Sequence, residues 1–280
     1  MDRELVLAVL ILAGAGASLA VCGRWRVHDD DAPNARSLES RRWLILWAPT
    51  LPAAAIVLWL IGWASVEPEN AEVVPWSLAG LSLLFAVVCV RALVRSIRRL
   101  RIPSHVPAYT AGLLHPTIFI SAGLASLLDD EARAAVVEHE RAHARHRDPL
   151  RVWLAELATD LQWPGVAATA RLNRWQEALE LARDLESRRA GVDGADLAAA
   201  ILEAHRLGGH GSTAAAGRSE NEACLRRRIA ALLAPLPNEV LPSRAHIPVL
   251  LALVLVSVFI AFSGEAFGES LVRAFFRALP

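Results

Sequence analysis

The chain of 280 residues carries 29 basic and 29 acidic side chains, so its formal net charge is zero. This balance gives no sign of the broad positive charge that nucleic-acid binding favours. Hydrophobic residues make up 54% of the chain and gather in long runs, a pattern more typical of a membrane protein than of a soluble one. Cys22, Cys89 and Cys224 lie far apart with no CxxC pair, which argues against a disulfide framework or a cysteine-based zinc site.

Four apolar stretches predict membrane-spanning helices. Their lengths suit a hydrocarbon layer of roughly 30 Å crossed as a helix. No small-residue cleavage site follows the first stretch, so we interpret it as a span and not as a signal peptide. The alternative, in which some stretches are core helices of a soluble protein, is disfavoured by their length. The predicted spans are residues 5–22, 43–64, 73–94 and 247–263.

The arginines of the connections predict the orientation of these spans. Residues 23–42 carry five arginines, and further basic clusters lie at residues 91–101 and 226–228. Residues 65–72 hold three glutamates and no basic residue. Because basic connections stay in the cytoplasm, we expect both termini outside the cell and residues 100–244 inside it.

Within residues 100–244 the apolar pattern predicts mainly helices and one small β-hairpin. Asp129 and the two acidic residues after it favour the start of a helix that runs to about His146 and ends before Pro149. The Gly-, Ala- and Ser-rich residues 207–217 are predicted to form a mobile loop. The predicted hairpin strands are residues 106–110 and 117–121, and further helices are predicted at residues 150–162, 168–190 and 225–233.

His139, Glu140 and His143 form an HExxH motif within the first of these helices. Residues four apart lie on one helix face, so both imidazoles can bind one Zn²⁺ while Glu140 faces a water molecule at the metal. A tetrahedral zinc with three protein ligands and water is the arrangement of a catalytic site. Glu140 is therefore the predicted general base for peptide hydrolysis. The alternative is a solvated polar helix face, and the apolar turns before the motif argue against it.

A third zinc ligand is expected from a separate helix. A metzincin would have a third histidine at position 149, and Pro149 excludes that class. Glu180 and Asp184 share a helix face, so Glu180 can bind the metal while Asp184 orients a histidine. One helix cannot easily place three ligands around a metal, so His146 is more plausible as a surface residue. The alternatives left open for the third ligand are Glu177, Glu186 and, with less support, His146.

These motifs resemble the membrane zinc metallopeptidases of the BlaR/MecR antirepressor family over about residues 105–190. The similarity rests on the stretch Pro116-Thr-Ile-Phe-Ile-Ser-Ala-Gly-Leu124, on HExxH with an aspartate five residues after its second histidine, and on the later Glu-x-x-x-Asp. It implies a gluzincin-type, zincin-like domain with its zinc site in the cytoplasm. The implied metal ligands are His139, His143 and Glu180, with Asp148 and Asp184 as residues that support them.

Two features depart from this family. Arg183 precedes Asp184 where the family usually has a cysteine. About 17 residues follow the fourth predicted span, which are too few to bury the core of a ligand pocket. We therefore expect no external penicillin-binding domain and no direct β-lactam binding.

The sequence thus predicts a four-span, mainly helical membrane protein that acts as a zinc-dependent endopeptidase in the cytoplasm. The expected partners are membrane lipid and a cytoplasmic protein or peptide substrate, such as a transcriptional repressor, without direct nucleic-acid contact. An HtpX-like protease of membrane-protein quality control and an inactive signalling or scaffold subunit are the alternatives. The predicted domains are a membrane region at 1–99, a metallopeptidase at 100–244, and the fourth span with a short external amphipathic tail at 245–280.

Overall fold

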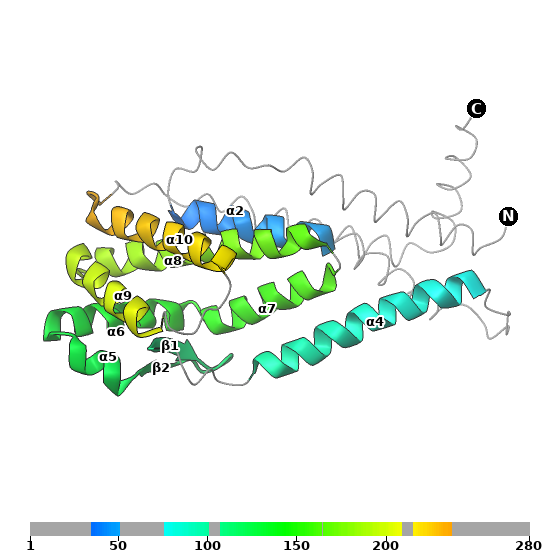
Figure 1. Cartoon of the computed structure of the whole chain (residues 1–280), viewed down its shortest axis with the longest axis horizontal. Coiled ribbons are helices and arrows are strands. Elements are labelled where there is room, and N and C mark those ends of the chain that lie inside the picture. Colours follow the sequence, from blue (N-terminus) through cyan, green and yellow to red (C-terminus); the bar gives the residue numbers. More distant parts are fainter. Residues whose placement is uncertain (1–34, 51–75, 101–106, 164, 209–214, 237–280) are drawn as a thin grey trace, which may run out of the picture.

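The computed structural model describes residues 35–50, 76–100, 107–163, 165–208 and 215–236 (Figure 1). In these ranges the chain is mainly helical with one small β-hairpin, which confirms the predicted secondary-structure class. The elements in chain order are α2 (Ala35–Trp47), the 3-10 turn η2 (Ala48–Thr50), α4 (Trp76–Arg99), β1 (Ala108–Ala111), β2 (Thr117–Ile120), α5 (Ala122–Leu127), α6 (Asp130–Arg145), α7 (Asp148–Leu161), α8 (Val166–Arg189), α9 (Gly194–Gly208) and α10 (Ala215–Leu233).

The hairpin packs beside α6. Its strands pair antiparallel with Tyr109 opposite Phe119, and the two rings stack with their centroids 5.2 Å apart. Gly112 in the turn has a φ of +99°, and a Cβ at this position would lie 2.5 Å from the carbonyl oxygen of His115. Only glycine fits such a backbone without strain. The turn therefore fixes β1 alongside the helix that carries the HExxH motif.

Helix α6 begins where its sequence predicts. Asp129 accepts a hydrogen bond from the backbone N–H of Ala132 at 2.8 Å, an N-cap that contributes about 1 kcal/mol. Two acidic residues follow in the first turn, where they complement the helix dipole. Arg147, with a φ of 51°, separates α6 from α7, and Pro149 occupies the first turn of α7. The helix bearing the motif is thus defined at both ends by local sequence.

Helix α8 lies at the centre of the bundle, with α2, α6, α7 and α10 packed against it (Figure 1). Trp175 of α8 is fully buried and packs with Leu46 and Leu179. Trp43 of α2 lies against it, with the ring centroids 4.9 Å apart. A buried aromatic pair of this kind provides both a large apolar area and a preferred geometry. The core thus holds α8 firmly behind the metal site.

The four-span layout and the domain boundaries stay predictions. The predicted spans at residues 5–22 and 247–263 lie outside the described residues. Of the predicted span at 43–64, only residues 43–50 are described. They form the end of α2, which packs against α8, and the turn η2. The predicted span at 73–94 overlaps α4. Within the described ranges, no helix is long and apolar enough to cross a membrane.

Two helices near the end of the described chain differ from the prediction. The sequence pattern predicts no helix at α9 and only the second half of α10. The predicted loop at residues 207–217 is wrong at both ends, because α9 continues to Gly208 and α10 begins at Ala215. Leu197, Ala198 and Ala200 form the buried face of α9, and the alanine-rich sequence favours a helix, so the signal was present in the sequence and was missed.

Candidate zinc site

The two histidines of the HExxH motif lie one turn apart on α6 and face the same side. Their Nε2 atoms are 3.1 Å apart, and the ring centroids are 4.8 Å apart. His139 and Glu140 are buried, at 6% and 8% exposure. The motif therefore points into the protein, as the apolar turns before it predict.

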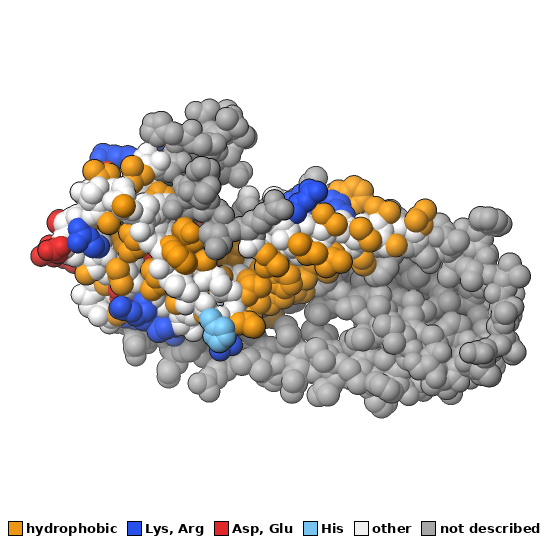
Figure 2. Space-filling model, turned by 90° about the horizontal axis from the view of Figure 1, so that it is seen from below, with side chains coloured by type: hydrophobic (Ala, Val, Ile, Leu, Met, Phe, Trp, Pro, Cys, Tyr) orange, Lys and Arg blue, Asp and Glu red, His pale blue; other side chains and the backbone are white. Residues whose placement is uncertain are grey.

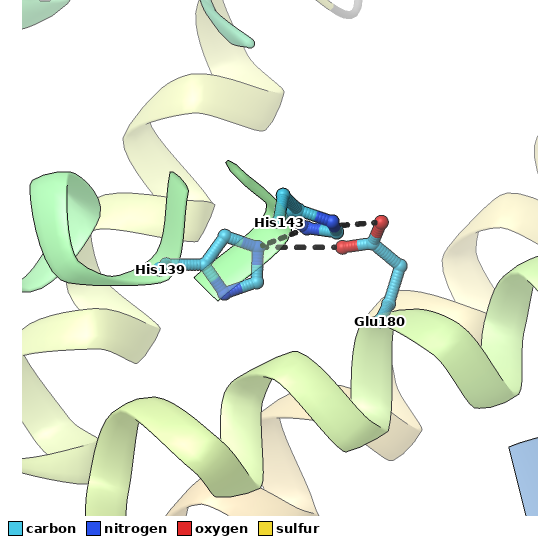
Figure 3. Close-up of side chains that lie close together, drawn as sticks. All are labelled: His139, His143 and Glu180. Atoms are coloured by element: carbon cyan, nitrogen blue, oxygen red, sulfur yellow. Dashed lines mark hydrogen bonds and ion pairs between the residues drawn. The ribbon is translucent and has the colours of Figure 1, made fainter. Parts of the chain in front are cut away.

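Glu180 reaches both histidines from α8 (Figure 3). Its Oε2 atom lies 3.5 Å from Nε2 of His139, and its Oε1 atom lies 3.6 Å from Nε2 of His143. Tetrahedral ligands at about 2.1 Å from Zn²⁺ stand about 3.4 Å from one another. Two imidazole nitrogens and one carboxylate oxygen at these distances fit Zn²⁺ in both donor type and spacing.

A carboxylate faces the outer nitrogen of each histidine. Nδ1 of His139 lies 3.1 Å from Oδ1 of Asp184, and Nδ1 of His143 lies 2.9 Å from Oδ2 of Asp148. Both aspartates are buried. Such contacts set the ring orientation of metal-binding histidines. The supporting role predicted for these two residues is consistent with this placement.

The segment that holds all three ligands matches a known family. Residues 95–184 match the model of Peptidase family M48. Over these residues the chain is similar to that family. With its His139, His143 and Glu180 cluster, the protein is a zinc metallopeptidase. The match does not resolve the finer resemblance to the antirepressor family. No curated protein and no solved structure matches the chain.

Arg228 of α10 joins the zinc site from beyond the segment that matches the family. Its Nε and Nη2 atoms donate to the two carboxylate oxygens of Asp184 at 2.8 and 2.9 Å. Its Nη1 atom lies 3.0 Å from Oε2 of Glu180. The sequence gives no sign of this role, because Arg228 ends a run of three arginines without any motif spacing.

Neighbouring charges shift the pKa values of His139, Glu180 and Asp184 at the zinc site. Burial alone lowers the pKa of His139, but Asp184 and Glu180 outweigh burial and raise it to about 10. Burial raises the pKa of Glu180 and of Asp184, but Arg228 and the histidines hold the pKa of both carboxyls below the usual range. Both carboxylates are therefore anionic at neutral pH, as binding of a divalent cation requires.

The other residues considered as the third zinc ligand, Glu177, Glu186 and His146, form ion pairs away from the two histidines of the motif. Oε1 of Glu177 lies 2.5 Å from Nε of Arg227. Glu186 contacts Nε2 of His146 at 2.8 Å and Nη2 of Arg145 at 2.9 Å. The metal-binding cluster found among the described residues contains neither glutamate and not His146. The structure therefore favours Glu180 over the ligands that the sequence left open.

Arg183 supports the zinc site through Asp148, the aspartate that faces His143. The buried guanidinium donates from Nε at 2.6 Å and from Nη2 at 3.3 Å to the two oxygens of Asp148. Burial raises the pKa of Asp148, but His143 and Arg183 outweigh it and lower the pKa to about 2. Removing one partner of such a buried pair typically costs about 3–5 kcal/mol.

The zinc ligands line a cavity of about 440 Å³. Much of the remaining lining is apolar and comes from α9, including Leu197, Ala200 and Ile201. Tyr109 on β1 borders the same cavity. A space of this size accepts amino-acid side chains of a substrate. The other lining residues are Ala108, Leu124, Val136, Ala204, His205, Cys224, Leu225 and Arg228.

Glu140 lies in this cavity beside the ligands and is held by the hairpin. Oγ1 of Thr110 on β1 donates to Oε2 of Glu140 at 2.7 Å. The sequence did not predict the contact between Thr110 and Glu140, because the two residues are thirty positions apart and belong to no common motif. Glu140 thus lies in the same cavity as the zinc ligands, with its carboxylate held by Thr110.

Proposed function

We propose that the protein is a multi-pass membrane endopeptidase that cleaves a cytoplasmic regulatory protein, such as a transcriptional repressor. The observation that carries the endopeptidase part is the placement of the zinc ligands and Glu140 in one cavity with a largely apolar lining. The regulatory target rests on the resemblance to the antirepressor family and on the predicted orientation of the spans.

The chemistry is hydrolysis of a peptide bond. Zn²⁺ in this site supplies a Lewis acid that activates water and polarises a carbonyl. Glu140 acts as general base, taking a proton from the attacking water and delivering it to the leaving amine. Thr110 orients the Glu140 carboxylate through its hydrogen bond. The buried aspartates behind the two histidines hold the imidazole rings in place.

The substrate segment is proposed to be extended, with an aliphatic side chain next to the scissile bond. Among the described residues β1 pairs only with β2, so backbone groups on its other edge are available to pair with an added strand. Ala108 and Tyr109 of this strand line the cavity. The apolar residues of α9 then receive the side chain of the bound segment.

Membrane attachment is supported by a row of exposed apolar side chains on α4. Leu83, Val87, Val90 and Val94 lie at helical spacing and are 41–67% exposed. Figure 2 shows hydrophobic side chains along the arm that α4 forms. A row of this length is unusual on a surface that meets only water. Together with the arginine distribution, it supports an active site held at the cytoplasmic face of a membrane.

Reporter fusions test the proposed orientation. Fusions after Arg101 and after Arg218 are expected to read cytoplasmic, and fusions after Glu69 and after Pro280 are expected to read external. An external signal at Arg218 would contradict the four-span layout and the cytoplasmic site.

Comparison of cytoplasmic proteomes tests the regulatory role. Cells with Glu140→Gln protein are expected to retain one regulator that wild-type cells cleave. In a separate test, labelled penicillin is expected not to acylate the purified protein. Accumulation of many damaged membrane proteins, with no single regulator stabilised, would favour quality control instead. Equal proteomes from both strains would favour the inactive scaffold.

A further inference from the structure

Arg228 connects α10 to two functional carboxylates of α8 at once. It contacts Asp184 through two hydrogen bonds of 2.8 and 2.9 Å and Glu180 through one ion pair of 3.0 Å. Asp184 in turn faces His139, and Glu180 faces both histidines. The guanidinium therefore touches one metal ligand directly and a second one through a single intermediate residue.

The geometry of these contacts requires arginine. A guanidinium presents its N–H groups in a rigid planar fork, so one edge can pair with both oxygens of a carboxylate while another N–H reaches a second acceptor. Arg228 uses Nε and Nη2 for Asp184 and Nη1 for Glu180. Lysine has a single compact ammonium group and cannot reproduce all three contacts.

The negative charge of the site also favours a cation at the position of Arg228. Glu140, Glu180 and Asp184 are three carboxylates beside the two histidines; Glu140 and Asp184 are buried, and the Glu180 side chain is 32% exposed. Zn²⁺ with Arg228 brings three positive charges, which balance them. Glu180 and Asp184 lie one turn apart on the same helix face, where like charges repel. The guanidinium lies between their side chains, and its own side chain is only 15% exposed.

We infer that Arg228 is a positioning residue that fixes Glu180 and Asp184 in the geometry that Zn²⁺ needs. Its Nη1 atom lies 3.0 Å from Oε2 of Glu180, and Oε1 of that carboxylate faces Nε2 of His143. Helix α10 is thus a part of the metal site, although it lies outside the segment that matches the peptidase family.

Arg227 provides a matched control. It is the preceding residue on the same helix and also pairs with a glutamate of α8, but its partner is Glu177 and its side chain is 62% exposed. Glu177 is not in the metal-binding cluster of the described residues. A general loosening of α10 on α8 would affect both variants, whereas a positioning role affects only Arg228.

Zinc affinity of the purified full-length protein tests the inference, measured by competition with a chromogenic chelator. Arg228→Ala is expected to weaken zinc binding by about 10–100-fold, the usual loss when the support of a ligand is removed. Arg228→Lys is expected to lose most of this affinity despite its charge, and Arg227→Ala is expected to stay within about twofold of wild type. Methylguanidinium is expected to restore part of the affinity of Arg228→Ala.

Wild-type affinity in Arg228→Ala, or an equal loss in Arg227→Ala, would overturn the inference. Thermal unfolding of the zinc-free variants accompanies the titrations, and if Arg228→Ala does not fold, Arg228→Lys decides the outcome. The readout is metal binding, so failure of the proposed regulatory role leaves this result unaffected. A wild-type protein without zinc affinity would instead contradict the zinc site itself.

Discussion

At the scale of single residues, the site is a set of acid–base contacts around two imidazoles. His139 and His143 each have one nitrogen facing Glu180 and the other facing a buried aspartate. Because each ring is held from both sides, its orientation does not depend on the metal alone. Removing the ligand carboxylate of Glu180 should therefore lower zinc binding, whereas removing the base Glu140 should lower the cleavage rate.

Replacing Glu140 with glutamine removes the base and leaves both imidazoles in place. We expect Glu140→Gln to bind zinc like wild type and to lose at least about 10²–10⁴-fold in the rate of peptide cleavage. Metal analysis and cleavage of a peptide by the purified protein measure the two effects. Cleavage at the wild-type rate would show that another group is the base.

Replacing Glu180 with alanine removes a metal ligand. We expect Glu180→Ala to lower zinc occupancy strongly, because only the two histidines of the cluster remain. Glu177→Ala is the matched control on the same helix, one turn earlier, and is expected to keep wild-type occupancy since Glu177 pairs with Arg227. If Glu177→Ala loses more zinc than Glu180→Ala, the ligand assignment is wrong.

At the scale of elements, α9 gives the cavity its shape. Its small residues Ala200 and Ala204 leave space beside the zinc ligands, and Leu197 and Ile201 make that space apolar. Because this wall is built by one helix, the preferred substrate side chain should respond to a single substitution on it.

Ala204→Phe fills part of this space. We expect kcat/KM for a peptide with leucine next to the scissile bond to fall about tenfold more than for the matching alanine peptide, since a few methylenes in an apolar pocket decide such ratios. Leu202→Ala on the same helix is the control, because Leu202 is 40% exposed and does not line the cavity. Equal losses for both peptides would exclude the cavity as the selective pocket.

At the scale of the whole molecule, ion pairs connect helices that are far apart in the sequence. Glu186 of α8 contacts Arg145 and His146 at the end of α6, and Arg36 of α2 lies 3.5 Å away. Burial raises the pKa of Glu186, but His146 and the arginines outweigh it and lower the pKa to about 2. Glu186 therefore binds its proton less readily in the folded protein than in the unfolded chain.

This difference predicts a pH dependence of stability. A carboxyl whose pKa is lowered on folding stabilises the protein above its unfolded pKa of about 4.5 and loses that contribution as pH falls toward 2. We expect chemical unfolding of the zinc-free protein to show this loss between about pH 5 and pH 2, and Glu186→Gln to reduce the slope. Glu203→Gln, which removes a surface pair with Arg206, should keep the wild-type slope.

The sequence by itself determined the local features of this protein. The position of His139 and His143 on one face follows from the helical repeat, and the start of α6 follows from the capping side chain of Asp129. The sequence favours Glu180 through its spacing to Asp184, but it leaves Glu177, Glu186 and His146 open as ligands. These features depend on residues within a few turns of one another, so a linear pattern contains them.

Only the tertiary structure decided what α2, α9 and α10 do. Trp43 and Leu46 read as the start of a membrane span, yet they pack against α8, because a protein core and a lipid layer accept the same apolar side chains. Arg228 and Arg227 are neighbours in one basic run, yet only Arg228 reaches the metal ligands. Which of two adjacent arginines points at Glu180 depends on the rotation of α10 against α8, and that rotation is set by packing between residues more than forty positions apart.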